Sequence, residues 1–101
     1  MSDLKDVQKL IFNNKMEKGF NVTNVELEFC YTQGELAEAF EAYRKRLPSV
    51  GEELADVAIY LYGIAEILGV DLNEEIIKKV SKNEKRVYKN IEGANVRISE
   101  G

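Results

Sequence analysis

The sequence has no histidine, and it has only one cysteine and one proline. Without histidine, the chain cannot use Ser-His-Asp hydrolysis, His-based acid–base catalysis, typical zinc sites or carboxylate–histidine di-iron bundles. Its single cysteine, Cys30, excludes an internal disulfide framework and suits a reducing cytoplasm, where we expect it as a small core residue. Any metal site must therefore use oxygen ligands, which suit Mg²⁺ or Mn²⁺ and, less directly, Ca²⁺.

Long apolar runs and a strong positive charge are also missing. The most apolar run, from Val57 to Val70, contains Glu66 and is too short to cross a bilayer. The N-terminus lacks the pattern of a signal peptide. A net charge of −4 argues against binding a nucleic-acid polymer through its backbone. We expect a cytoplasmic protein with no membrane partner and no nucleic-acid polymer partner.

Helical periodicity predicts an all-α chain of four helices. The first should begin near Ser2 and end before Gly19, since apolar residues recur there at helical spacing. Three capping boxes begin the others, which we expect at about 23–46, 49–69 and 71–90. Residues 1–92 should form one domain of modest core, and residues 93–101 a flexible tail.

The turn between the second and third helices is short and contains Pro48. Such a turn predicts an antiparallel helix hairpin. The third helix is apolar on more than one stripe, and a helix of that kind needs burial on more than one side. We therefore expect the four helices to pack into a helical-bundle homo-oligomer.

Two pairs of acids are central to the sequence. Glu35 and Glu38 lie three residues apart, as do Glu53 and Asp56. On a helix, residues at this spacing share a face. None of the four has a basic residue three or four positions downstream in its own helix.

An ordinary solvated face would carry such basic partners, as the chain does elsewhere with Glu41 and Lys45 and with Glu74 and Lys78. The pattern thus favours a functional carboxylate cluster over surface acids. In the hairpin, the two acid pairs would face each other. Two carboxylates about 4 Å apart repel by roughly 4 kcal/mol at an effective dielectric of 20, and a divalent cation would reverse that repulsion.

Basic residues gather near the C-terminus, between Lys78 and Lys89. Asn83 and Arg86 lie three apart within this block. It has two interpretations: a solvated helix end that suits the helix dipole, or a phosphate-binding face. The pattern alone favours the solvated helix end.

Taken in order, G-E-L-A-E-A, E-L-A-D-V-x-x-Y-L and K-x-x-x-N-x-x-R resemble the MazG-like all-α nucleoside triphosphate pyrophosphohydrolases over residues 20–88. The resemblance implies a homodimer or homotetramer that uses Mg²⁺ to hydrolyse a nucleoside triphosphate to a monophosphate and pyrophosphate. It also implies that Glu53 and Asp56 bind metal together with Glu35. The residues that would meet the triphosphate are Lys79, Asn83 and Arg86.

The sequence departs from the family at Thr32, where many members carry a glutamate. Glu38 or Glu28 could replace the missing ligand, because each lies within a turn or two of Glu35 on the same helix. Two alternatives stay open: a catalytically weak relative that only binds nucleotide and metal, and a helical oligomerisation module without activity.

Overall fold

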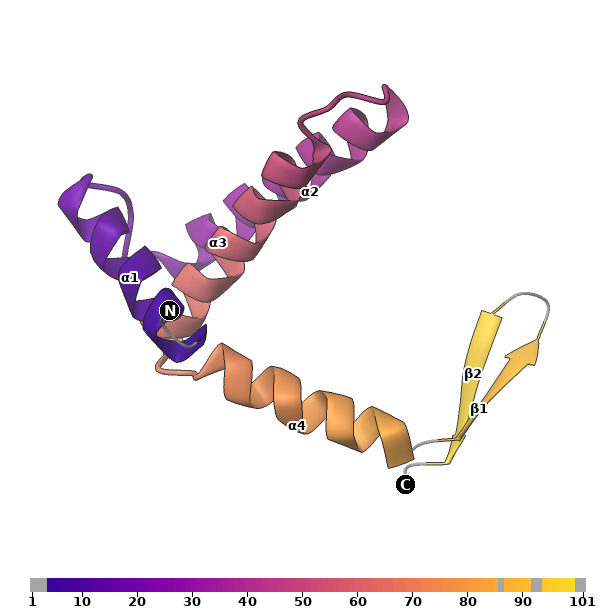
Figure 1. The fold of residues 1–101 in the computed structure, drawn as a ribbon. Coiled ribbons are helices and arrows are strands. Elements are labelled where there is room, and N and C mark those ends of the chain that lie inside the picture. Colours follow the sequence, from indigo (N-terminus) through magenta and orange to yellow (C-terminus); the bar gives the residue numbers. More distant parts are fainter. Residues whose placement is uncertain (1–3, 86, 92–93, 100–101) are drawn as a thin grey trace. The chain divides into compact units, whose positions relative to one another are not determined.

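A computed structural model of the chain describes residues 4–85, 87–91 and 94–99, with side chains described for residues 7–85. The four predicted helices are confirmed: α1 (Leu4–Glu17), α2 (Val25–Arg44), α3 (Val50–Leu68) and α4 (Leu72–Lys85). Two strands follow, β1 (Val87–Ile91) and β2 (Ala94–Ser99) (Figure 1). The described chain divides into two compact units, of which the first contains α1, α2 and α3 and the second begins at Leu72.

In the first unit, α2 and α3 lie side by side (Figure 1). They run in opposite directions: Tyr31 meets Tyr60, with ring centroids 6.1 Å apart, whereas Glu38, later in α2, lies near Glu53, earlier in α3. The turn between them includes Arg46 in the left-handed region, at φ 57°. Glu35 and Glu38 lie in the middle of α2, whereas Glu53 lies in the first turn of α3.

The core of this unit is built from small and branched side chains. Ala39 and Ala42 of α2 are buried, as are Ile64 and Ala65 of α3. Alanines allow the two helix backbones to approach closely, and α1 then packs against α3. Cys30 is exposed, so its predicted place in the core is wrong.

The helix boundaries follow local capping. Asn24, rather than the predicted Thr23, is the N-cap of α2, and its side chain accepts a hydrogen bond from the Leu27 backbone N–H at 3.0 Å. Gly69 ends α3 in the left-handed conformation, at φ 71°, with its N–H bonded to the last turn of the helix. The start near Ser49 and the end at Gly69 match the predicted helix, but the Ser49 side chain makes no capping hydrogen bond, so the predicted capping box is not formed there.

The second unit differs from the all-α prediction beyond Lys85. Where a helix to about Asn90 and then a flexible tail were expected, β1 and β2 pair as an antiparallel two-stranded sheet. In register, Lys89 lies opposite Val96 and Ile91 opposite Ala94. Val96 and Ile98 alternate with polar residues, a period-two pattern that favours a strand and is too short to stand out in the sequence.

Candidate functional site: a carboxylate cluster between two helices

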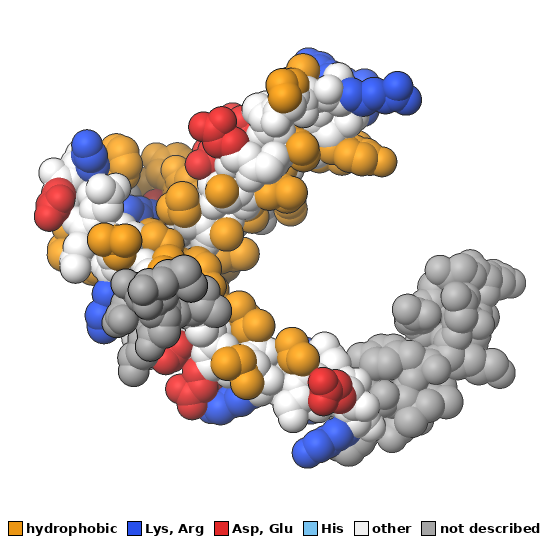
Figure 2. Space-filling model, viewed as in Figure 1, with side chains coloured by type: hydrophobic (Ala, Val, Ile, Leu, Met, Phe, Trp, Pro, Cys, Tyr) orange, Lys and Arg blue, Asp and Glu red, His pale blue; other side chains and the backbone are white. Residues whose placement is uncertain are grey.

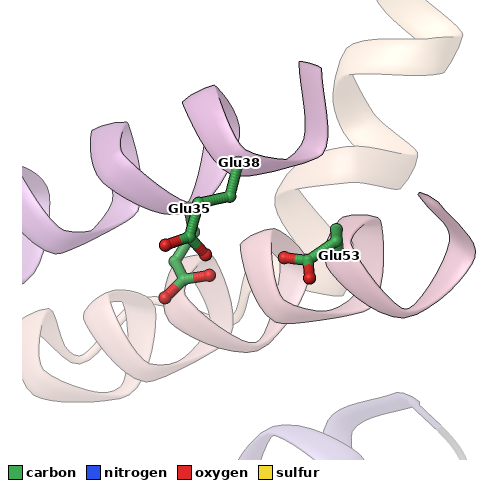
Figure 3. A group of neighbouring side chains, drawn as sticks. All are labelled: Glu35, Glu38 and Glu53. Atoms are coloured by element: carbon green, nitrogen blue, oxygen red, sulfur yellow. The ribbon is translucent and has the colours of Figure 1, made fainter. Parts of the chain in front are cut away.

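Three of the four predicted carboxylates meet between α2 and α3. Glu35, Glu38 and Glu53 each place one carboxylate oxygen within 4.8 Å of the others. Figure 3 shows Glu35 and Glu38 projecting from neighbouring turns of α2, with Glu53 on the adjacent turn of α3. Spacing along α2 joins the first two, and the packing of α3 adds the third.

Two oxygens of this cluster are buried without a hydrogen-bond partner among the described residues. They are Oε2 of Glu35 and Oε2 of Glu53. A buried polar atom without a partner costs free energy, about 1–3 kcal/mol and more for a charged group. The cluster is therefore incomplete as an internal hydrogen-bond network, and its free atoms are acceptors suited to a cation.

The pKa shifts of two carboxyls in the cluster also favour a site for a cation. Burial raises the pKa of the Glu35 carboxyl above its usual range, and the charge and hydrogen bond of Glu38 raise it further. Burial also raises the pKa of Glu53, with the charges of Glu38 and Asp56 adding to the effect. Both shifts show that negative charge is crowded here with too little positive charge to balance it.

Asp56 lies beside the three-residue cluster rather than within it. Its charge acts on the carboxyls of both Glu35 and Glu53. Asp56 and Glu35 also line a pocket of about 740 Å³ formed by α1, α2, α3 and the segment after α1. The fourth predicted acid thus stands where the cluster opens into this pocket.

The pocket is lined by aromatic and charged side chains. Tyr31 and Tyr60 line it, and their rings meet edge to face. Burial raises the pKa of the Tyr60 hydroxyl, with the charges of Glu35 and Glu28 as further causes, so Tyr60 stays neutral and can act as a donor. Lys15 supplies the positive charge in the pocket lining.

Sequence reasoning missed Lys15, which forms a buried ion pair with Glu28. The signal was present, because Gln8, Ile11 and Lys15 follow the helical spacing of the apolar face of α1. A lysine on such a face needs a buried partner. Glu28, proposed above as a substitute metal ligand, is that partner and is fully buried at 1% exposure.

The predicted basic residues lie in the second unit. Lys79 and Asn83 are exposed and four residues apart on α4, so they share one face of that helix. Arg86 lies outside the described residues. The predicted ion pairs of Glu41 with Lys45, at 3.7 Å, and of Glu74 with Lys78, at 3.4 Å, are confirmed.

The fold and the cluster together define a class: a helical protein whose antiparallel helices α2 and α3 bring three carboxylates together. Residues 21–97 match the model of the MazG-like family, and the chain belongs to that family. No match was found among curated proteins or among solved structures. Members of the family are generally related to nucleotide pyrophosphatases and are typically metal-dependent.

The residues present fit a divalent metal. The donor set consists of carboxylate oxygens, which Mg²⁺ and Mn²⁺ prefer, and two of these oxygens are buried without a partner among the described residues. Within the described part of the chain, none of the helices is both long enough and apolar enough to cross a membrane.

Proposed function

We propose that this protein is a Mg²⁺-dependent nucleotide pyrophosphohydrolase, which converts a nucleoside triphosphate to its monophosphate and pyrophosphate. Family membership supports the class of reaction. The observation that carries the proposal is the cluster of Glu35, Glu38 and Glu53 with its two unpartnered oxygens. Glu35 also lines a pocket of about 740 Å³, which is large enough for a nucleoside.

In this proposal Glu35, Glu38 and Glu53 hold the metal, and Asp56 is the fourth carboxylate at the pocket side. When bound, Mg²⁺ would neutralise phosphate oxygens and lower the pKa of a water molecule. A nucleotide carries several negative charges of its own. The site would therefore repel the substrate unless the charge of the carboxylates is balanced.

The carboxylates also supply the base for hydrolysis. A water oxygen attacks a phosphorus of the α–β anhydride, its proton passes to a carboxylate, and the bond to the bridging oxygen breaks. Asp56 is the acid we assign to orient that water, because it stands at the edge of the cluster next to the pocket. Lys79, Asn83 and Arg86 remain our proposal for the triphosphate-binding residues, on the resemblance to the family.

A second copy of the chain would complete the fold. Phe29, Leu36, Phe40 and Tyr43 lie on one stripe of α2, and all are exposed in the single chain, Tyr43 by 71%. Hydrophobic side chains gather over the α2–α3 pair in Figure 2. Ala39 and Ala42, two of the buried residues of α2, each lie one position before a stripe residue, so the stripe is rotated about 100° from that buried face. We propose a homodimer or homotetramer that covers this stripe.

Pyrophosphate release from a panel of ribo- and deoxyribonucleoside triphosphates, with Mg²⁺ and with chelator, tests the proposal. We expect release that requires the metal. Absence of release from every triphosphate, in protein that binds Mg²⁺ and nucleotide, would instead identify a non-catalytic binding protein. That second candidate is favoured by Thr32, which offers no carboxylate where many members of the family have one.

A further inference from the structure

The pocket beside the carboxylate cluster contains a buried ion pair that the proposed reaction does not use. Lys15 of α1 is 6% exposed and Glu28 of α2 is 1% exposed, and the lysine donates a hydrogen bond to Oε1 of the glutamate. Asn21 donates to the other oxygen of Glu28 at 3.1 Å. Both charged residues line the same pocket as Glu35 and Asp56.

The side chain of Lys15 lies across α3 at a position where that helix has no side chain. A Cβ added at Gly63 would come within 3.1 Å of the lysine Nζ and 3.3 Å of its Cδ. The same ammonium stands over the Tyr60 ring, 4.9 Å from its centroid. Because Gly63 has no side chain, Lys15 can extend past α3 into the pocket. There its ammonium contacts the Tyr60 ring and the Glu28 carboxylate.

The stability of the fold does not by itself explain the buried Lys15–Glu28 ion pair. The desolvation of two buried charges offsets most of their attraction, and apolar residues of similar size stabilise equally well or better. An ammonium has three N–H donors, and the described contacts use one for Glu28 and direct another at the Tyr60 ring. One donor is left for a ligand in the pocket.

We propose that the Lys15–Glu28 pair recognises the edge of the nucleotide base by hydrogen bonds, with the base lying in this pocket against Tyr31 and Tyr60. The inference rests on the proposed function and adds its specificity-determining residues. A base is a flat heteroaromatic ring, and aromatic side chains stack on such rings. Its edge carries acceptors and donors side by side, as does the pair, with a donor on Lys15 and acceptor lone pairs on Glu28.

The double variant Lys15→Met/Glu28→Met separates recognition from folding. Removing one partner would leave the other charge buried alone and could unfold the protein, whereas removing both keeps the size of the side chains without either charge. The matched control is Arg44→Met/Glu41→Met, which removes a solvent-exposed ion pair on α2, with a distance of 2.9 Å.

We expect the wild type to prefer some bases over others in kcat/KM across the triphosphate panel. The double variant should keep the melting temperature of the wild type. It should lose about tenfold for the preferred base, as expected for one hydrogen bond to a charged group, so that the values for all bases converge. The control should keep the wild-type ratios. Unchanged ratios in the folded double variant, or no base preference in the wild type, would overturn the inference.

Uncharged nucleosides keep this test separate from the proposed reaction. Adenosine, guanosine, cytidine and uridine carry no phosphate, so their binding needs no metal to offset repulsion between phosphate and carboxylate charges. In chelator, NMR titrations that follow the ring signals of Tyr31 and Tyr60 should show the preferred nucleoside binding about tenfold more weakly to the double variant than to the wild type and the control. The other nucleosides should bind all three proteins alike. Equal affinity of the double variant and the wild type for the preferred nucleoside, or no binding by the wild type, would refute base recognition. Failure of pyrophosphate release would refute the proposed reaction instead.

Discussion

The hydroxyl of Thr32 donates a hydrogen bond to the backbone carbonyl oxygen of Glu28, four residues earlier in α2, at 2.7 Å. This is the usual local bond of a threonine inside a helix. Thr32 therefore directs its oxygen along its own helix rather than offering it as a free ligand. A carboxylate ligand, which the family resemblance implies at this position, must then come from another residue or be absent.

Glu38, and not Glu28, is expected to serve as the replacement. Glu38 lies in the carboxylate cluster, whereas both oxygens of Glu28 have partners. In calorimetric titrations, Glu38→Gln should weaken Mg²⁺ binding about tenfold or more, or ~1.4 kcal/mol, as Glu35→Gln should. Glu41→Gln, on the same helix, is the control and should bind like the wild type. Unaltered affinity in Glu38→Gln would remove that residue from the ligand set.

Mg²⁺ or Mn²⁺ should raise the melting temperature of the protein. The cation binds the folded cluster and not the unfolded chain, which adds about 1.4 kcal/mol of unfolding free energy at ten times Kd. For a domain of this size that is a shift of roughly 5–10 °C. Calorimetry with Mg²⁺ and with chelator at matched ionic strength measures it. Superimposable melting curves would contradict a metal site.

Asp56→Asn should reduce pyrophosphate release at least about 100-fold and leave the fold intact. The amide keeps the shape of the side chain but has no negative charge, so it no longer orients the attacking water as a carboxylate does. In chelator the variant should melt at the same temperature as the wild type or higher, because one charge that repels Glu35 and Glu53 is gone. Normal turnover by the folded variant would show that Asp56 has no role in the reaction.

The contact of α1 with the end of α3 should depend on pH through Glu66. Gln8 donates to Glu66 at 3.0 Å and Lys9 lies 3.2 Å away, and the hydrogen bond from Gln8, followed by that from Lys9 and its charge, lowers the pKa of Glu66. A lowered pKa means that this stabilisation is present above the ordinary glutamate pKa and is lost as pH falls through the folded value.

The variant Glu66→Gln tests this dependence. At pH 7 its unfolding free energy should be about 1 kcal/mol below that of the wild type, as measured by urea denaturation. Toward pH 3 the two should converge. Asp71 lines the same small pocket of about 270 Å³, so Asp71→Asn serves as the control for a neighbouring acid. A difference that does not change with pH would refute the role of the ionised Glu66.

The chain should not be a monomer in solution. Light scattering at low micromolar concentration should give the mass of a dimer or a larger assembly, because the stripe of α2 around Phe40 is uncovered in one copy. Phe40→Glu should shift the mass toward the monomer, since it places a charge in the apolar contact. Lys18→Glu, on the exposed turn after α1, should leave the mass unchanged. A wild-type monomer would refute the assembly.

Much of the first unit could be read from the sequence. Capping residues and glycines mark where a helix begins and ends, and these signals act within a few residues of the chain. Gly69 marked the end of α3, and the predicted starts of α2 and α3 lie within one or two residues of the observed ones. Helical spacing also predicted that Glu35 and Glu38 share a face, because the period of a helix fixes that relation before any packing.

Only the tertiary structure decided what each face meets. The sequence separation of residues does not predict that Glu53 lies in the cluster while Asp56 lines the pocket. Nor does it predict that Lys15 passes Gly63 and pairs with Glu28. These relations depend on the depth and angle at which helices pack, which many side chains set together. The strands after Lys85 escaped prediction for a related reason: a two-stranded sheet is determined by pairing, and neither strand alone carries a pattern long enough to predict it.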